Sequence, residues 1–187
     1  MAYIQMKHSY KRYKTGDLEI IANNDVSFDI EKGELVVILG ASGAGKSTVL
    51  NILGGMDTND EGRVIIDGKD ITRLPEHKRA KFIGRVFQDP MMGTAPTMQI
   101  EENLALAYRR GQKRGLGSGI TNEERELYRE KLATLGLGLE NRMTSKVGLL
   151  SGGQRQALTL LMATLVTPKL LLLDEHTAAL DPATAEK

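Results

Sequence analysis

The sequence contains no cysteine and no tryptophan among its 187 residues, and only 4% of the residues are aromatic. Without cysteine, a disulfide framework, thiolate chemistry and cysteine-ligated metal sites are all excluded. The formal net charge is only +1, so no excess of one sign favours nucleic acid or an acidic membrane surface as the main partner. Hydrophobic residues make up 41% of the chain, which predicts one sizeable core with room for an accessory lobe.

Long apolar runs are also missing. The longest candidate, residues 157–173, is interrupted by three threonines and by Pro168-Lys169, whereas a membrane-spanning helix needs about twenty nearly unbroken apolar residues. This stretch instead predicts a helix followed by a fully buried strand at 170–173. The N-terminus likewise lacks the apolar stretch of a signal peptide.

One glycine-rich segment stands out, and it reads Gly40-Ala41-Ser42-Gly43-Ala44-Gly45-Lys46-Ser47-Thr48. We predict a buried strand before it at 35–39 and a helix after it that ends near Gly54-Gly55. This order is the setting of a phosphate-binding loop, because glycines turn backbone N–H groups inward and the helix N-terminus attracts anions. Lys46 would supply a charge to the terminal phosphates, and Ser47 would be an oxygen ligand for Mg²⁺. The alternative is a glycine-rich turn without a ligand.

The predicted strand at 170–173 ends in Asp174-Glu175. Ligands of doubly wound sheets bind at the carboxyl ends of strands, so we expect Asp174 to face the glycine-rich loop and to hold Mg²⁺ through a water. Glu175 is then placed to polarise an attacking water as general base. The alternative is a strand end with two solvated acids.

Residues 150–154, Leu-Ser-Gly-Gly-Gln, predict a second glycine-rich helix N-terminus and therefore a second anion site. One nucleotide does not obviously need two such sites. The glycine-rich loop, Gln88, this segment and the acidic strand end occur in an order that resembles ATP-binding subunits of the ABC ATPase superfamily. In that family two subunits pack head to tail, and each such segment caps the ATP held by the other subunit.

The resemblance implies an α/β fold with a P-loop core, an antiparallel β lobe and an inserted helical lobe. It covers essentially the whole chain as a single domain. Residues 1–90 would form the core and antiparallel lobe, 91–150 the helical lobe, and 151–187 the signature helix, the acidic strand and the D-loop.

The resemblance also assigns roles to single residues. Tyr13 would stack on adenine, with a plain strand-pairing tyrosine as the alternative. Gln88 would touch Mg²⁺ and the attacking water, with a polar strand end as the alternative. The residues expected to contact the partner's ATP or to communicate with the partner are Ser151, Gly152, Gly153, Gln154 and Asp181.

The expected ligands are ATP and Mg²⁺, and the expected partners are a second copy of the chain and a transmembrane permease, with no nucleic acid. Such a subunit would lie in the cytoplasm on the inner face of the membrane and would push on the permease near residues 91–98. Two alternatives stay open. One is a soluble ABC ATPase that does not act in transport, and the other is a module that binds ATP with little turnover.

The chain departs from the family pattern in three places. His176 replaces the usual proline, and the sequence stops at Lys187, before the strand that normally carries a switch histidine, so we expect a C-terminally truncated domain. The first third resembles ATPases of lipoprotein-release and macrolide-export systems, whereas the rest resembles those of amino-acid-type uptake systems, which slightly favours import. We therefore hypothesise a composite with a seam near residues 70–74.

Overall fold

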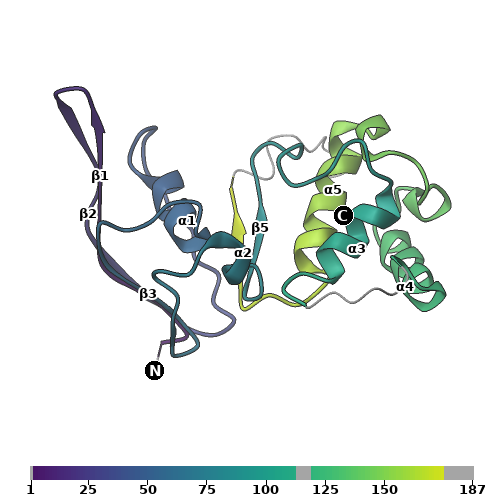
Figure 1. Ribbon diagram of the computed structural model, residues 1–187, viewed down its shortest axis with the longest axis horizontal. Coiled ribbons are helices and arrows are strands. Elements are labelled where there is room, and N and C mark those ends of the chain that lie inside the picture. The colour runs from purple at the N-terminus through teal and green to yellow at the C-terminus, as the bar shows by residue number, and fades with distance from the viewer. Residues whose placement is uncertain (1, 113–118, 175–187) are drawn as a thin grey trace. The chain divides into compact units, whose positions relative to one another are not determined.

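The computed structural model describes residues 2–112 and 119–174, which form two compact units that meet in sequence between Ile83 and Gly84 (Figure 1). The chain mixes helices and strands, as the predicted α/β class requires. The finer division at residues 90 and 150 stays a prediction.

The first unit is built on a four-stranded antiparallel sheet with the order β2-β1-β3-β4. The strands are β1 (Ile4–Thr15), β2 (Leu18–Ile30), β3 (Glu61–Ile66) and β4 (Lys69–Asp70). The predicted antiparallel lobe is confirmed, because all three strand pairings of this sheet are antiparallel. Its strands come from two stretches of the sequence, 4–30 and 61–70. A tight turn joins β1 to β2, with Gly16 at φ 61°.

Two helices complete the first unit, α1 (Lys46–Gly54) and α2 (Glu76–Arg79). Helix α1 ends as predicted, since Gly55 adopts a left-handed conformation with φ 86° and its N–H donates to the Asn51 carbonyl. The buried side chains of α1 are Val49, Ile52 and Leu53. The helix is thus held by its inner face, while its N-terminus carries the glycine-rich loop.

The buried strand predicted at residues 35–39 is wrong. The segment forms no strand, and its five side chains are between 39% and 86% exposed. An apolar run becomes a buried parallel strand only where neighbouring strands bond its backbone and helices cover its faces. Neither of the two sheets in the described part of the chain includes this segment.

The second unit contains the strands β5 (Ile83–Val86) and β6 (Leu170–Leu173), which pair with each other, and the helices α3 (Ile100–Tyr108), α4 (Asn122–Ala133) and α5 (Gly152–Thr164). Two short 3-10 turns are η1 (Leu139–Asn141) and η2 (Val147–Leu149). Strand β6 has the predicted bounds, but the prediction that it is fully buried is wrong. Only Leu172 is buried, at 4% exposure, because one of the two edges of β6 has no strand partner among the described residues.

The helices of the second unit share one apolar core. Its buried members are Ile100, Leu104, Ala105, Tyr128, Leu132, Leu139, Met143, Val147, Leu150 and Leu158. Two ion pairs at the edge of this core link the α3 region to α4, Arg109 with Glu124 at 2.6 Å and Arg125 with Glu101 at 3.1 Å. The helices predicted at 91–150 therefore share their core with Leu158 of α5, which follows that segment. No helix within the described ranges is long and apolar enough to span a membrane.

Candidate functional site

The glycine-rich loop, residues 40–48, lies in the first unit and opens helix α1. Gly43 and Gly45 both have left-handed backbones, with φ of 80° and 86°. A side chain at position 45 is also excluded sterically, because a Cβ atom there would lie 2.3 Å from the Ala22 carbonyl oxygen. Within the described residues no side chain caps the N-terminus of α1, so its first N–H groups remain available to an anion.

Lys46 is the first residue of α1, and its side chain folds back over the loop. Its Nζ donates to the carbonyl oxygens of Gly40 and Ala41, each at 2.8 Å. The ammonium group therefore sits at the mouth of the loop, and Ser47 is exposed beside it. A phosphate with negative oxygens would be a stronger partner for this cation than two neutral carbonyls.

Tyr13 lies near the end of β1 and belongs to a small charged cluster in the same unit. Its hydroxyl donates to Asp57 at 2.5 Å, and the Lys11 ammonium lies 2.7 Å from the same carboxylate. Burial and the hydrogen bond to Asp57 raise the pKa of Tyr13. Burial opposes ionisation of Asp57, but the hydrogen bonds from Lys11 and Tyr13 outweigh it and lower the pKa of Asp57.

Asp174 and Gln88 lie in the second unit, where β5 and β6 run side by side (Figure 1). The Asp174 N–H donates to the Val86 carbonyl at 3.2 Å. Asp174 therefore lies beside Val86, the last residue of β5, and Gln88 follows Val86 by two residues. The Asp174 carboxylate is 4.0 Å from the Arg85 guanidinium, a distance at the limit of an ion pair. The structure thus brings two of the three expected Mg²⁺ ligands to neighbouring strand ends.

Helix α5 begins in the predicted segment. Ser151 Oγ accepts from the Gln154 N–H, and Gln154 Oε1 accepts from the Ser151 N–H, both at 3.2 Å. This reciprocal capping box fixes the helix start. Ser151 and Gly152 are exposed, and a Cβ at Gly152 would meet no atom within 4 Å. The helix N-terminus is therefore exposed at its first two residues.

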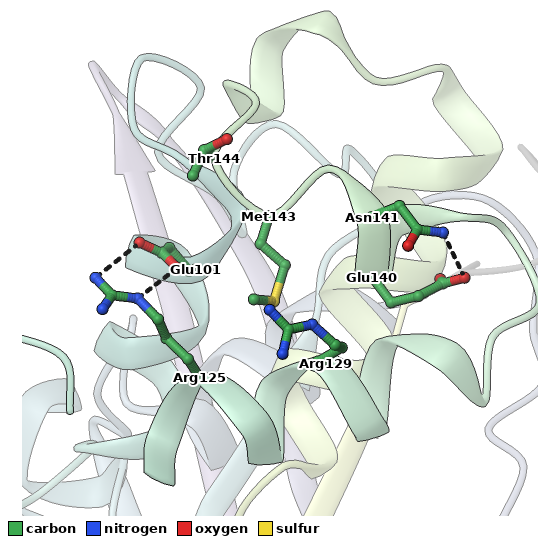
Figure 2. Close-up of a pocket in the computed structure, with 7 residues that line it drawn as sticks. All are labelled: Glu101, Arg125, Arg129, Glu140, Asn141, Met143 and Thr144. Carbon is green, nitrogen blue, oxygen red and sulfur yellow. Dashed lines mark hydrogen bonds and ion pairs between the residues drawn. The ribbon is translucent and has the colours of Figure 1, made fainter. Parts of the chain in front are cut away.

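A pocket of about 280 Å³ also lies in the second unit, lined by Glu101, Arg125, Arg129, Glu140, Asn141, Met143 and Thr144. None of the predicted site residues is in this lining. Figure 2 shows that its polar groups mostly satisfy one another, since Arg125 pairs with Glu101 and Asn141 donates to Glu140 at 3.2 Å. The pocket is a gap between paired side chains, and no catalytic chemistry follows from it.

The predicted site residues fall into three groups. Tyr13 and residues 40–48 are in the first unit, and Gln88, Asp174 and residues 151–154 are in the second. Glu175 and Asp181 lie outside the described residues, as does His176. That the loop of the first unit meets the strand ends of the second stays a prediction from the sequence.

Lys11 and Asp57 hold Tyr13 in the structure, and neither was predicted from the sequence to have a role. The only local signal is that Lys11 and Tyr13 are two apart on one strand, so they share a face of the sheet. Asp57 is 44 residues from Tyr13 in sequence, and no spacing rule connects them.

Comparison with known proteins places this geometry in a family. The family described as ABC transporter matches residues 23–178. A tyrosine transport ATP-binding protein of Clostridioides difficile is 44% identical over 98% of this chain and 73% of its own length. A spermidine/putrescine import ATP-binding protein of Protochlamydia amoebophila is 40% identical over 95% of this chain, which spans only 43% of that relative.

The fold matches solved structures as well. An ATP-binding cassette determined as a dimer in a post-hydrolysis state with ADP and Pi superposes with a TM-score of 0.83, at 36% identity over 98% of this chain and 78% of that one. The alignment with the Clostridioides difficile relative covers both sides of the expected seam at residues 70–74. A composite origin is therefore not needed to explain the chain.

Proposed function

The chain belongs to the ABC transporter family, and from this premise we propose that it is the subunit that binds and hydrolyses ATP to drive a membrane transporter. The observation that carries the proposal is the loop at the start of α1, with Gly45 in a left-handed conformation and the Lys46 ammonium at its mouth. Such a loop binds the phosphates of a nucleotide through backbone N–H groups and one mobile cation.

The residues present fit Mg²⁺ by their chemistry. The Ser47 hydroxyl, the Gln88 amide oxygen and the Asp174 carboxylate are hard oxygen donors, and Mg²⁺ prefers such donors together with phosphate oxygens and waters. We assign these three residues to it, and the ion neutralises phosphate charge when bound. Lys46 stabilises the terminal phosphates, and Glu175 takes the proton of the attacking water.

A second copy of the chain completes the proposed site. Ser151 to Gln154 form an exposed helix N-terminus in the second unit, and in a head-to-tail dimer it binds the γ-phosphate held by the partner. Asp181 lies in the segment proposed to communicate between the copies. The dimeric form of the similar cassette supports this arrangement.

The proposed membrane partner is a permease subunit, which places the chain in the cytoplasm against the inner face of the membrane. Met91 and Met92, at 40% and 62% exposure, suit an adaptable docking surface for such a partner. The transported solute is proposed to be imported, with tyrosine the first to test, because the relatives matched include a tyrosine transport protein and a spermidine/putrescine import protein.

The first experiment measures ATP binding and phosphate release by the chain with Mg²⁺. We expect binding and turnover by the wild type, and binding with turnover lowered by at least about a hundredfold in Glu175→Gln, because the general base is lost. Binding without turnover in both proteins would favour a module that only binds nucleotide. Absence of binding would overturn the proposal.

A second experiment tests the shared site by complementation. Lys46→Met and Ser151→Arg should each be inactive alone, since each spoils both sites of a homodimer. Mixed dimers would contain one site with an intact loop and an intact capping helix, so the mixture should regain about a quarter of the wild-type rate. A mixture as inactive as its components would contradict the head-to-tail dimer.

A further inference from the structure

We propose that Lys11 and Asp57 are positioning residues for Tyr13, and that they hold its ring so that the base of the nucleotide stacks on one face only. This rests on the proposed function, because it assigns the base of ATP to this ring. Three contacts in the first unit carry the inference. The Tyr13 hydroxyl donates to Asp57 Oδ2 at 2.5 Å, Lys11 Nζ lies 2.7 Å from Asp57 Oδ1, and the same nitrogen is 5.2 Å from the centre of the Tyr13 ring.

Asp57 is itself anchored to the helix that opens at the glycine-rich loop. It follows α1, and its N–H donates to the Asn51 carbonyl at 3.3 Å. Its Oδ1 also accepts from the Thr58 N–H at 2.7 Å. Both carboxylate oxygens therefore have partners, and the side chain has one favoured orientation.

Helix α1 thus connects two parts of one nucleotide site. Its N-terminus presents the loop expected to hold the phosphates, and the residue that fixes Tyr13 follows its C-terminus. Thr48, in the first turn of the same helix, also interacts with Tyr13 and lowers the pKa of Tyr13 against the effect of burial. The distance between the base and the phosphates is thereby set by one rigid element.

The Lys11 ammonium covers one face of the Tyr13 ring and leaves the other face for stacking. Its side chain is only 11% exposed, and Nζ also donates to the Thr58 carbonyl at 3.0 Å. A cation held over a ring is attracted by its π-electrons, and it blocks stacking on that face. Tyr13 keeps 37% exposure, which leaves ring surface for a planar base on the other side.

The test compares two ligands that differ in the base. Calorimetry with Mg²⁺ gives the Kd of ATP and of inorganic tripolyphosphate, which needs the loop but not the ring. Asp57→Asn and Tyr13→Phe each remove one side of the tether and keep the size of the side chain. Both should weaken ATP binding by about three- to tenfold, with the tripolyphosphate Kd unchanged.

Two further variants sharpen the result. Lys11→Met should also weaken ATP alone, because the ring is no longer held from one face. The double variant Tyr13→Phe/Asp57→Asn should bind ATP no more weakly than the single variant with the higher Kd. Both single changes remove the same hydrogen bond, so their effects should not add. The matched control is Asp60→Asn, which should leave both Kd values unchanged. Asp60 Oδ1 lies 3.7 Å from Lys11 Nζ, and Asp60 Oδ2 accepts from the Arg12 N–H rather than from Tyr13.

Three outcomes would overturn the inference. They are an unchanged ATP Kd in Asp57→Asn, an equal loss for ATP and tripolyphosphate, and an equal loss in Asp60→Asn. A wild-type protein that binds tripolyphosphate but gains nothing from the base would also overturn it, while leaving the phosphate site intact. A wild type that binds neither ligand would overturn the proposed function itself.

Discussion

The ammonium nitrogen of Lys46 lies 2.8 Å from the carbonyl oxygen of Gly40, six residues earlier in the chain. The same nitrogen bonds the next carbonyl, that of Ala41. The lysine side chain therefore bridges the two ends of the glycine-rich loop. We expect the backbone N–H groups of this loop to bind phosphate oxygens. On binding, the ammonium would exchange neutral acceptors for charged ones, which are roughly twice as strong.

Lys46→Met should weaken ATP binding by at least about tenfold, because it removes the cation and keeps the length of the stem. Stability should change little, since the two carbonyls it leaves are on exposed residues and can bond water. Fluorescence titration with a labelled nucleotide, together with urea unfolding, checks both expectations. Lys81→Met, at an exposed position outside residues 40–48, is the control. Equal binding by both variants would contradict the role of Lys46.

Gly45→Ala should destabilise the protein by about 2–4 kcal/mol, because the new Cβ would meet the Ala22 carbonyl at 2.3 Å and the residue has φ 86°. Gly43→Ala is the matched comparison. It has a similar φ of 80° but no atom within 4 Å of the added Cβ, so it should cost only about 1 kcal/mol of backbone strain. Urea unfolding measures both, and equal losses would mean that the close approach to Ala22 is not important.

Arg79→Met should lower the free energy of unfolding by about 3–5 kcal/mol. The Arg79 guanidinium is buried at 1% exposure. It donates to the carbonyls of Ile52, Leu53, Thr72 and Leu74, so its removal leaves buried acceptors at the end of α1 without a donor. Arg73→Met, at an exposed position, should be nearly neutral in the same denaturation experiment. A small loss in Arg79→Met would mean that water replaces the guanidinium.

Local signals predicted two helix limits, and long-range contacts account for what was missed. Gly54-Gly55 was expected to end α1 and residues 150–154 to begin α5, and both helices end and begin there. Residues 35–39 were predicted to be buried from their apolar side chains alone, yet burial of a strand depends on neighbours that the segment does not contain. The tie between Tyr13 and Asp57 spans 44 residues, and it became visible only when the sheet placed β1 beside the end of α1.

The candidate site was predicted residue by residue because motifs fix chemistry over short distances. Gln88 and Asp174 were expected near one another, and the pairing of β5 with β6 puts their strand ends side by side. In the single chain the side chains of Ser151 and Gln154 bond each other's backbone, and their contact with a phosphate of a second molecule stays a prediction.

The free energy of unfolding should decrease at alkaline pH because of the ionisation of Tyr128 in the unfolded state. Burial above all, with Glu124 adding to it, raises the pKa of Tyr128 to about 12, compared with about 10 in an unfolded chain. Below pH 10 the phenol is neutral in both states and its contribution is complete. As pH rises from about 10 towards 12, only the unfolded state loses the proton, so stability falls by about 1.4 kcal/mol per pH unit.

Tyr128→Phe removes this alkaline loss and provides the control. The Tyr128 hydroxyl is buried and has no hydrogen-bond partner within the described part of the chain, so its deletion should leave stability at pH 7 unchanged or raise it by about 1 kcal/mol. Urea unfolding of both proteins between about pH 8 and 11 gives the two curves, which should diverge only above about pH 10. Parallel curves would show that Tyr128 ionises equally easily in the folded state, and the burial of its hydroxyl would then not govern its pKa.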